Sequence, residues 1–271
     1  MLLPRIIPCL LLKGRGLVKS VRFGETTYLG DPVNIVRIFN DKFVDEVILL
    51  DIMASREQRP PHFDFIREIA EECFIPLTYG GGIASREDAA RLFSLGVEKV
   101  CLNTAAVRRP ALIRELSESF GRQSIVVAMD VKRDWLGRCR LAPGGALPAA
   151  DPGDIVEYAR QCESLGAGEL LVSAIDRDGT SRGYDLDLLG RISAAVGIPV
   201  IAAGGAGSLE HMREAIAVGG ASAAAAGTLF VLTGRHRAVL IQYPSRAELR
   251  RVFAPRPEAS GEPGPQTDAP R

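Results

Sequence analysis

Short hydrophobic runs recur along the chain, and each is followed by a polar or glycine-rich turn and then by a segment of helical character. The eight runs that predict β-strands are residues 5–12, 46–51, 75–79, 99–102, 124–130, 169–174, 198–203 and 221–226. Strands that alternate with helices indicate a parallel sheet. Eight such units, all with apolar strands, close most simply into a (β/α)8 barrel, with an open doubly wound sheet as the alternative.

Helix starts are marked by residues that cap a helix or suit its first turn. They are Asp31-Pro32, Ser85, Pro110, Asp151-Pro152 and Ser208. A side-chain oxygen at such a position accepts a hydrogen bond from a free backbone N–H, and proline fits the first turn because it has no N–H to leave unpaired. These positions fall between the predicted strands and therefore support the alternating pattern.

The segment at 75–106 is repeated 123 residues later, at 198–228. Both copies have Ile-Pro at the entry of a strand, paired glycines at its exit, and a glycine before the next strand, Gly96 or Gly219. Each copy also follows an apolar strand that a glutamate leads. Self-similarity of this kind sets the architecture. It predicts a barrel built of two similar halves, which an open sheet would not explain.

Composition restricts the class of protein. The 271 residues balance 33 basic against 33 acidic side chains, so no overall charge favours nucleic acid or a membrane, and no apolar run has the length of a membrane span. The five cysteines and three histidines show no metal-ligand spacing, which favours a cytoplasmic protein without a metal or other cofactor. Residues 1–253 are expected to form the barrel, and residues 254–271, rich in Pro and Gly, a disordered tail.

Glycines gather at the carboxyl ends of the predicted strands, where a (β/α)8 barrel has its active site. One group is Gly81, Gly82, Asn103 and Thr104, and the other is Gly179, Gly205, Ala226 and Gly227. Glycines, a hydroxyl and helix N-termini suit a phosphate, because they present N–H groups without an obstructing side chain. Two matched groups predict a substrate with a phosphate at each end, although glycines can also simply end strands.

Charged side chains at the same strand ends are the candidates for chemistry. Asp130 follows an apolar strand, so burial could raise its pKa and make it a general acid or base; the alternative is an aspartate that caps the next turn. Asp51 and Asp178 are weaker candidates, because aspartate is common in turns. Lys19, in the first loop, could reach a phosphate or a developing anion, and otherwise is a solvated lysine.

Several motifs resemble the cyclase subunit of imidazole glycerol phosphate synthase, and the resemblance runs from Met1 to about Phe230. They are Arg5-Ile6-Ile7-Pro8-Cys9-Leu10, Gly30-Asp31-Pro32, Leu50-Asp51-Ile52, Gly80-Gly81-Gly82-Ile83, Asn103-Thr104-Ala105-Ala106, Asp176-Arg177-Asp178-Gly179-Thr180, Gly183-Tyr184-Asp185-Leu186 and Gly204-Gly205-Ala206-Gly207. The resemblance implies a (β/α)8 barrel that forms a heterodimer with a glutaminase subunit. It implies that ammonia from the glutaminase is used to cleave a bisphosphate aminoimidazole-carboxamide ribonucleotide (PRFAR) into imidazole glycerol phosphate and an aminoimidazole ribotide (AICAR), as in histidine biosynthesis.

The resemblance also implies an ammonia gate at the opposite, N-terminal mouth of the barrel. Its positions match Arg5, Glu46, Lys99 and Glu169, two of each sign and all at strand starts. A neutral plug of salt bridges is the alternative, but an apolar residue would close the mouth at less cost. The chain carries no glutaminase site of its own, because neither Cys9 nor Cys101 lies in a strand-to-turn nucleophile elbow.

Three departures from the family pattern indicate a divergent branch. The resemblance implies catalytic aspartates at the ends of the first and fifth strands, but Leu11 stands at the first position and only Asp130 is present. Residues 141–148 replace a polar substrate loop, and residues 234–245 are extended and basic. These features resemble a branch associated with surface-polysaccharide (lipopolysaccharide, O-antigen) loci, in which the pair supplies ammonia to a sugar amidotransferase that builds acetamidino groups.

Three hypotheses for the function follow. The chain is an active cyclase of histidine biosynthesis; or it is a cyclase-impaired partner that supplies ammonia to a sugar amidotransferase; or it is a non-catalytic phosphate-binding barrel or an unrelated phosphosugar enzyme that uses Lys19 or Lys99. Leucine is neither an acid nor a base, and a general acid or base contributes roughly 10²–10⁴-fold to a rate. Leu11 therefore separates the first hypothesis from the second, while the charged strand starts argue against the third.

Overall fold

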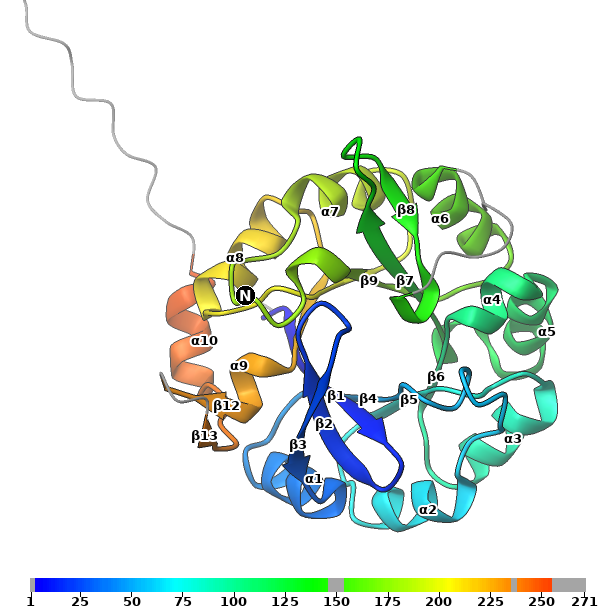
Figure 1. Ribbon diagram of the computed structural model, residues 1–271, viewed down its shortest axis with the longest axis horizontal. Coiled ribbons are helices and arrows are strands. Elements are labelled where there is room, and N and C mark those ends of the chain that lie inside the picture. The colour runs from blue at the N-terminus through cyan, green and yellow to red at the C-terminus, as the bar shows by residue number, and fades with distance from the viewer. Residues whose placement is uncertain (1–2, 146–153, 235–237, 255–271) are drawn as a thin grey trace, which may run out of the picture.

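Eight parallel strands close into a barrel in the computed structural model, which describes residues 3–145, 154–234 and 238–254. The barrel strands are β1 (Arg5–Lys13), β4 (Val47–Asp51), β5 (Leu77–Gly80), β6 (Lys99–Leu102), β7 (Ile125–Arg133), β9 (Glu169–Ala174), β10 (Val200–Ala203) and β11 (Ala223–Ala226). Each strand pairs with the next in this order, and β11 pairs with β1 (Figure 1). The closed ladder confirms the (β/α)8 barrel and excludes the open sheet.

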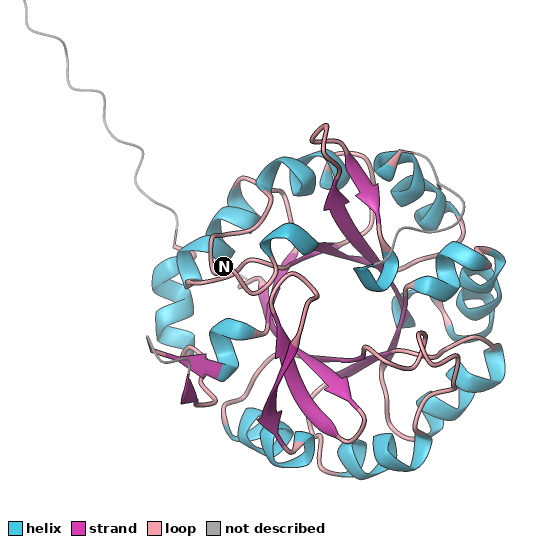
Figure 2. Ribbon diagram, viewed as in Figure 1, coloured by secondary structure: helices cyan, strands magenta, loops and turns pink. Residues whose placement is uncertain are grey.

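Helices alternate with the strands and surround the barrel (Figure 2). They are α1 (Pro32–Asp41), α2 (Phe63–Glu71), α3 (Arg86–Ser94), α4 (Thr104–Arg108), α5 (Ala111–Phe120), α6 (Ile155–Ser164), α7 (Leu186–Ser193), α8 (Leu209–Ala217), α9 (Thr228–Val231) and α10 (Arg246–Val252). Apolar side chains recur at helical spacing and pack on the strands; in α1, for example, Ile35, Val36 and Phe39 are buried. Among the described residues, no helix combines the length and the apolar character needed to cross a membrane.

Four of the five predicted helix starts are found at the first residues of described helices, α1, α3, α5 and α8. Three side chains each accept a hydrogen bond from the backbone N–H three residues further on: Asp31, Ser85 and Ser208. Pro110 occupies the N-cap position of α5. Asp151-Pro152 lies outside the described residues, and α6 is capped by Asp154.

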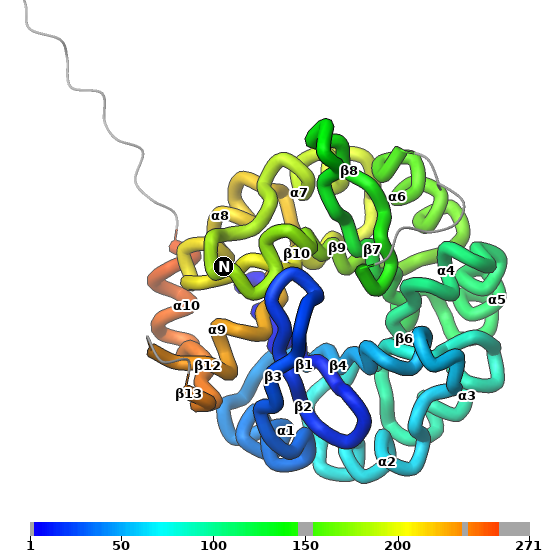
Figure 3. Tube along the Cα trace, viewed as in Figure 1, coloured from blue at the N-terminus to red at the C-terminus, as the bar shows by residue number. Residues whose placement is uncertain are grey.

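Hairpins extend the barrel beyond the carboxyl ends of two strands. β2 (Gly16–Ser20) pairs with β1 and with β3 (Thr26–Gly30), and β8 (Cys139–Leu141) pairs with β7. Figure 3 shows the two hairpins on opposite sides of the barrel opening. The first loop is therefore structured on the active face, which brings Lys19 toward the barrel axis instead of leaving it in solvent.

The remaining described elements are short. They are the 3₁₀ turns η1 (Arg122–Ser124), η2 (Pro143–Gly145) and η3 (Ile175–Arg177), and a two-stranded sheet of β12 (Leu232–Thr233) and β13 (Ala238–Val239). Of the predicted tail, residues 255–271 lie outside the described part of the chain.

The barrel encloses an apolar interior that is distinct from the core beneath the helices. Its buried side chains are Ile7, Ile48, Cys101, Val126, Ala128, Leu171, Ile201, Ala203, Ala223 and Ala225. The alanines come from β7, β10 and β11, so this side of the interior carries small side chains. The interior joins the two mouths of the barrel without a charged group in this layer.

The capping box at the start of α3 gives a test of local stability. Ser85 Oγ accepts a hydrogen bond from Asp88 N at 3.1 Å, and the Asp88 carboxylate accepts one from Ser85 N at 3.0 Å. Ser85→Ala removes the first of these bonds, so we expect the free energy of unfolding, measured by urea titration, to fall by about 1 kcal/mol. Ser94→Ala is the matched control, because Ser94 lies exposed at the other end of α3 and donates to Arg91 O. Equal losses in the two variants would contradict the stabilising role of the cap.

Candidate active site

A cavity of about 370 Å³ lies at the carboxyl ends of the barrel strands. Its lining includes most of the predicted site residues: Lys19, Asp51, Gly81, Gly82, Asn103, Thr104, Asp130, Asp178, Ala226 and Gly227, together with Leu11. Gly179 and Gly205 lie outside this lining. The volume is typical of a pocket for a small molecule. Within the described part of the chain, no group of three or more His, Cys, Asp or Glu side chains is arranged to hold a metal ion.

Asp130 lies on β7, where the strand reaches the cavity, and it is 6% exposed. Its Oδ2 accepts hydrogen bonds from Asn103 Nδ2 at 2.6 Å and from Gly144 N at 2.8 Å. Burial raises the pKa of Asp130 to about 6, while the hydrogen bonds from Gly144 and Asn103 oppose the rise. A carboxyl with this pKa exchanges a proton readily near neutral pH, which suits a general acid or base.

Lys19 and Asp178 form a buried ion pair beside Asp130. Lys19 Nζ lies 3.0 Å and 3.1 Å from the two carboxylate oxygens of Asp178. The charge of Asp178 also contributes to the raised pKa of Asp130, which places the two carboxylates near each other. Lys19 is therefore neither solvated nor alone. It brings a positive charge, already partly compensated, to the cavity.

Asp51 is occupied by structural contacts. Its carboxylate accepts hydrogen bonds from the backbone N–H groups of Met53 and Ala54, at 3.0 Å and 3.1 Å, and from Arg59 Nη2 at 2.8 Å. These contacts fold the turn after β4 and pair the charge. Asp51 thus has little capacity to act as the second acid or base of the cavity.

Backbone packing requires glycine in both predicted phosphate pockets. A Cβ on Gly81 would lie 2.5 Å from the carbonyl oxygen of Asp51, and one on Gly205 would lie 2.2 Å from that of Gly183. Both glycines also have positive φ, 120° and 119°. Close packing and positive φ therefore account for these glycines without a ligand. Phosphate binding stays a prediction.

Two buried oxygen atoms at the strand ends have no hydrogen-bond partner among the described residues, Asn103 Oδ1 and Thr228 Oγ1. Asn103 directly precedes α4 and Thr228 begins α9, so they lie one position apart at the matching helix starts of the two halves of the barrel. Buried polar atoms are normally paired, and both are candidates to contact a ligand. Thr228 is not among the predicted site residues, although the repeat aligns it with Thr104.

A contact across the cavity mouth holds the turn that covers Asp130. Arg56 Nη2, from the segment after β4, donates to the carbonyl oxygen of Gly144 at 2.8 Å. Gly144 in turn donates its N–H to Asp130. Sequence reasoning missed both residues, because a basic residue in one loop and a glycine in another carry no signal that the loops meet.

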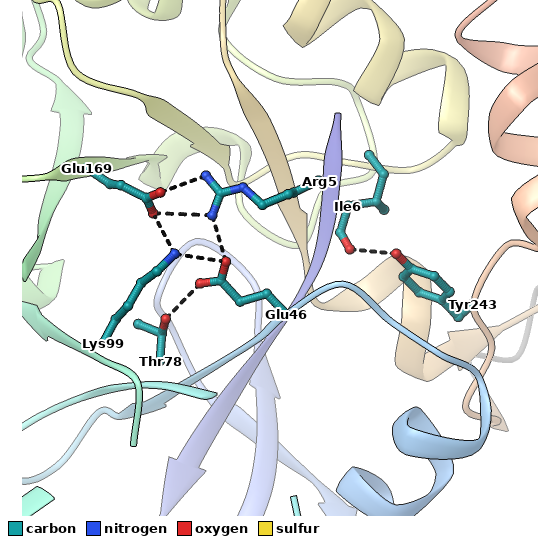
Figure 4. A network of polar contacts seen from close by, with 7 residues as sticks. All are labelled: Arg5, Ile6, Glu46, Thr78, Lys99, Glu169 and Tyr243. Atoms are coloured by element: carbon teal, nitrogen blue, oxygen red, sulfur yellow. Dashed lines mark hydrogen bonds and ion pairs between the residues drawn. The ribbon is translucent and has the colours of Figure 1, made fainter. Parts of the chain in front are cut away.

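Four charged side chains meet at the opposite mouth, and we call them the charged ring: Arg5, Glu46, Lys99 and Glu169 (Figure 4). Arg5 contacts Glu46 at 2.7 Å and Glu169 at 2.8 Å, and Lys99 Nζ contacts the same two glutamates at 3.1 Å and 3.3 Å. Thr78 Oγ1, which the sequence analysis missed, donates to Glu46 Oε1 at 2.8 Å. Each cation contacts both anions, so the ring is neutral and closed.

These features define a class: a (β/α)8 barrel with a titratable carboxyl group in a cavity at one mouth and a compensated ring of charges at the other. The chain belongs to the histidine biosynthesis protein family, whose model matches residues 5–236.

Relatives resemble the chain over most of its length. It is 49% identical over 241 residues to a Pseudomonas aeruginosa protein named "putative imidazole glycerol phosphate synthase subunit hisF2", which covers 89% of this chain and 95% of the relative. It is 43% identical over 256 residues to a "putative imidazole glycerol phosphate synthase subunit HisF" of Leptospira interrogans, and the match covers 93% of this chain and 100% of that protein. The imidazole glycerol phosphate synthase subunit HisF of Alkaliphilus metalliredigens is 45% identical over 230 residues, which cover 85% of this chain and 91% of that protein. The resemblance stated from the motifs is confirmed at the level of this family.

The hydrogen bond from Asn103 predicts how Asp130 titrates. The amide N–H stabilises the ionised carboxylate, so Asn103→Ala should raise the pKa of Asp130 from about 6 by roughly one pH unit. A ¹³C-carboxyl NMR titration measures the change. Asn40→Ala is the control, because Asn40 makes its hydrogen bonds to the main chain at the other end of the barrel. An unchanged or lower pKa in Asn103→Ala would refute this account of Asp130.

Proposed function

We propose that the chain is the ammonia-accepting cyclase subunit of an imidazole glycerol phosphate synthase. In this reaction ammonia and PRFAR yield imidazole glycerol phosphate and AICAR. The observation that carries the proposal is the alignment of three features along one axis: the charged ring, the apolar interior and the cavity that contains Asp130. The family membership and the names of the relatives support the same reaction type.

The proposal gives each group in the cavity a task. The two strand-end pockets hold the two phosphates of the substrate. Asn103 Oδ1 in the lining is free to accept a hydrogen bond from the substrate, and Thr228 Oγ1, next to the lining residue Gly227, can donate or accept one. Asp130, with its pKa near 6, gives or takes a proton as the imidazole ring closes. Lys19, which Asp178 holds in place inside the cavity, stabilises negative charge that develops nearby.

A separate glutaminase subunit supplies the ammonia in this proposal. It would dock over the charged ring, so that ammonia enters where the ring now closes the mouth. Ammonia is small and neutral, and the alanine-lined side of the interior offers it a path without a charged group. The alternative, a plain salt-bridge plug, explains the closed ring equally well. It gives no reason, however, why four charged side chains and Thr78 lie there.

Leu11 favours a second candidate function. It lines the cavity where the family pattern has its first catalytic aspartate, and the other two aspartates of the lining, Asp51 and Asp178, are held in ion pairs. A barrel without its second acid or base would retain the ring and the interior. Such a cyclase-impaired protein could still supply ammonia, together with its glutaminase, to a sugar amidotransferase of O-antigen or surface-polysaccharide biosynthesis. A purely phosphate-binding barrel would use neither the ring nor the interior.

Turnover with ammonium salt tests the function without a partner. We expect the purified protein to consume PRFAR. The turnover rate should fall at least about a hundredfold in Asp130→Asn. It should rise roughly 10²–10⁴-fold in Leu11→Asp, because a second acid–base group is restored. Leu11→Asn, equal in size to Leu11→Asp but unable to titrate, is the control. If neither the native protein nor Leu11→Asp consumes PRFAR, the cyclase proposal fails and the ammonia-supplying alternative gains support.

Added bulk in the barrel interior tests the ammonia path. Ala223 on β11 faces the interior and is not part of the cavity lining, whereas its neighbour Ala224 faces the helices. Ala223→Leu should reduce glutamine-supported turnover with the glutaminase at least about tenfold, and ammonium-supported turnover much less, because ammonium can enter from the cavity. Ala224→Leu adds the same bulk on the other face and carries the same overpacking penalty. Equal ratios of the two activities in both variants would argue against passage through the barrel.

A further inference from the structure

The chain between β13 and α10 folds back along the outside of the barrel, and none of it lies within residues 5–236 matched by the family model. Hydrogen bonds fasten it to the segment after β11: Leu240 N donates to Val231 O at 3.1 Å, Gln242 N to Phe230 O at 2.9 Å and Gln242 Nε2 to Leu229 O at 3.0 Å. This stretch belongs to residues 234–245, which depart from the family pattern. The proposed function has so far given it no role.

Tyr243 is the residue by which this segment reaches the charged ring. Its hydroxyl donates to the carbonyl oxygen of Ile6 at 2.7 Å (Figure 4), and its ring packs on Phe230 with centroids 5.4 Å apart. Burial first, and then the charge of nearby Asp45, raise the pKa of Tyr243. The hydroxyl is thus bound to the residue that follows Arg5 in β1.

This contact spans a gap in the sheet. β1 pairs with β4 only from Cys9 with Ile48 onward, and the earlier residues of β1 pair with β11 on the other side. No ladder bond thus fixes Arg5 relative to Glu46, although these two make the shortest ion pair of the ring, 2.7 Å. Tyr243 binds the main chain of β1 at the level where the ladder with β4 is absent.

We propose that Tyr243 is a positioning residue for the charged ring. By binding Ile6 O it fixes the start of β1, and with it the position of Arg5 opposite Glu46, and so keeps the ring closed. The consequence for ammonia entry rests on the proposed function, whereas the spacing itself does not. A residue outside the family's matched region thereby controls a feature within it.

The test is an NMR measurement on the full-length protein labelled with ¹⁵N-arginine. The Arg5 signals are assigned by their loss in Arg5→Lys. Tyr243→Phe keeps the ring packing and removes only the hydroxyl, and hydrogen exchange of the Arg5 Nη protons should then accelerate by roughly fivefold, the effect of one lost hydrogen bond. Tyr184→Phe is the matched control, because Tyr184 is a second buried tyrosine whose hydroxyl donates to a strand carbonyl, Ala225 O at 2.9 Å.

The control separates positioning from general stability. We expect both variants to lower the melting temperature by similar amounts and only Tyr243→Phe to change the Arg5 exchange. Unchanged Arg5 exchange in Tyr243→Phe, or the same change in both variants, overturns the inference.

A second measurement separates this inference from the proposed function. With the glutaminase present, Tyr243→Phe should lower the ratio of glutamine-supported to ammonium-supported turnover, while Tyr184→Phe leaves it unchanged. Faster Arg5 exchange in a protein that shows no glutamine-supported turnover supports the positioning role and refutes the proposed function. Glutamine-supported turnover in the native protein, with Arg5 exchange unaffected by Tyr243→Phe, supports the function and overturns the positioning role.

Discussion

Pairing of β1 with β11 is the constraint on which the other features of the molecule depend. A closed sheet has no free edge, and its side chains alternate between the interior and the helices. On β1 the interior face carries Ile7 and Cys9, so the same alternation puts Arg5 at one mouth and Leu11 at the other. Other strands follow this order, as in Glu169, Leu171 and Ser173 on β9. Ring, interior and cavity are thus three layers of one set of inward-facing side chains.

The two mouths stabilise buried charge in different ways. In the charged ring each cation contacts both anions, so burial is offset by Coulomb attraction and hydrogen bonds. Asp130 receives amide hydrogen bonds instead, and burial raises its pKa to about 6. Because its pKa lies near 6, Asp130 can change its protonation state near neutral pH, which favours the cavity end for proton transfer.

Local pattern sufficed for the strands, for the starts of α1, α3, α5 and α8 and for the position of Asp130, because alternation and capping act over a few residues. Resemblance added the charged ring, whose members are up to 164 residues apart. Neither the local pattern nor the resemblance predicts contacts between loops, such as Arg56 with Gly144 and Arg59 with Asp51. Loop residues meet according to where the barrel places them. The tight packing at Gly81 against Asp51 has the same origin, since it follows from strand register and not from the glycine itself.

Leucine at position 11 fits the packing of the barrel, but it cannot donate or accept a proton. In the ladder Leu11 lies opposite Val18 and Leu50, so an apolar side chain has apolar neighbours there. A carboxylate at this position would add negative charge to a cavity in which the charge of Asp178 already raises the pKa of Asp130. The ring and the interior layer do not involve position 11 and are intact with leucine present. In the proposed function, ammonia would pass through those two layers and the imidazole ring would close in the cavity layer, so a change confined to position 11 would act on one role and leave the other in place.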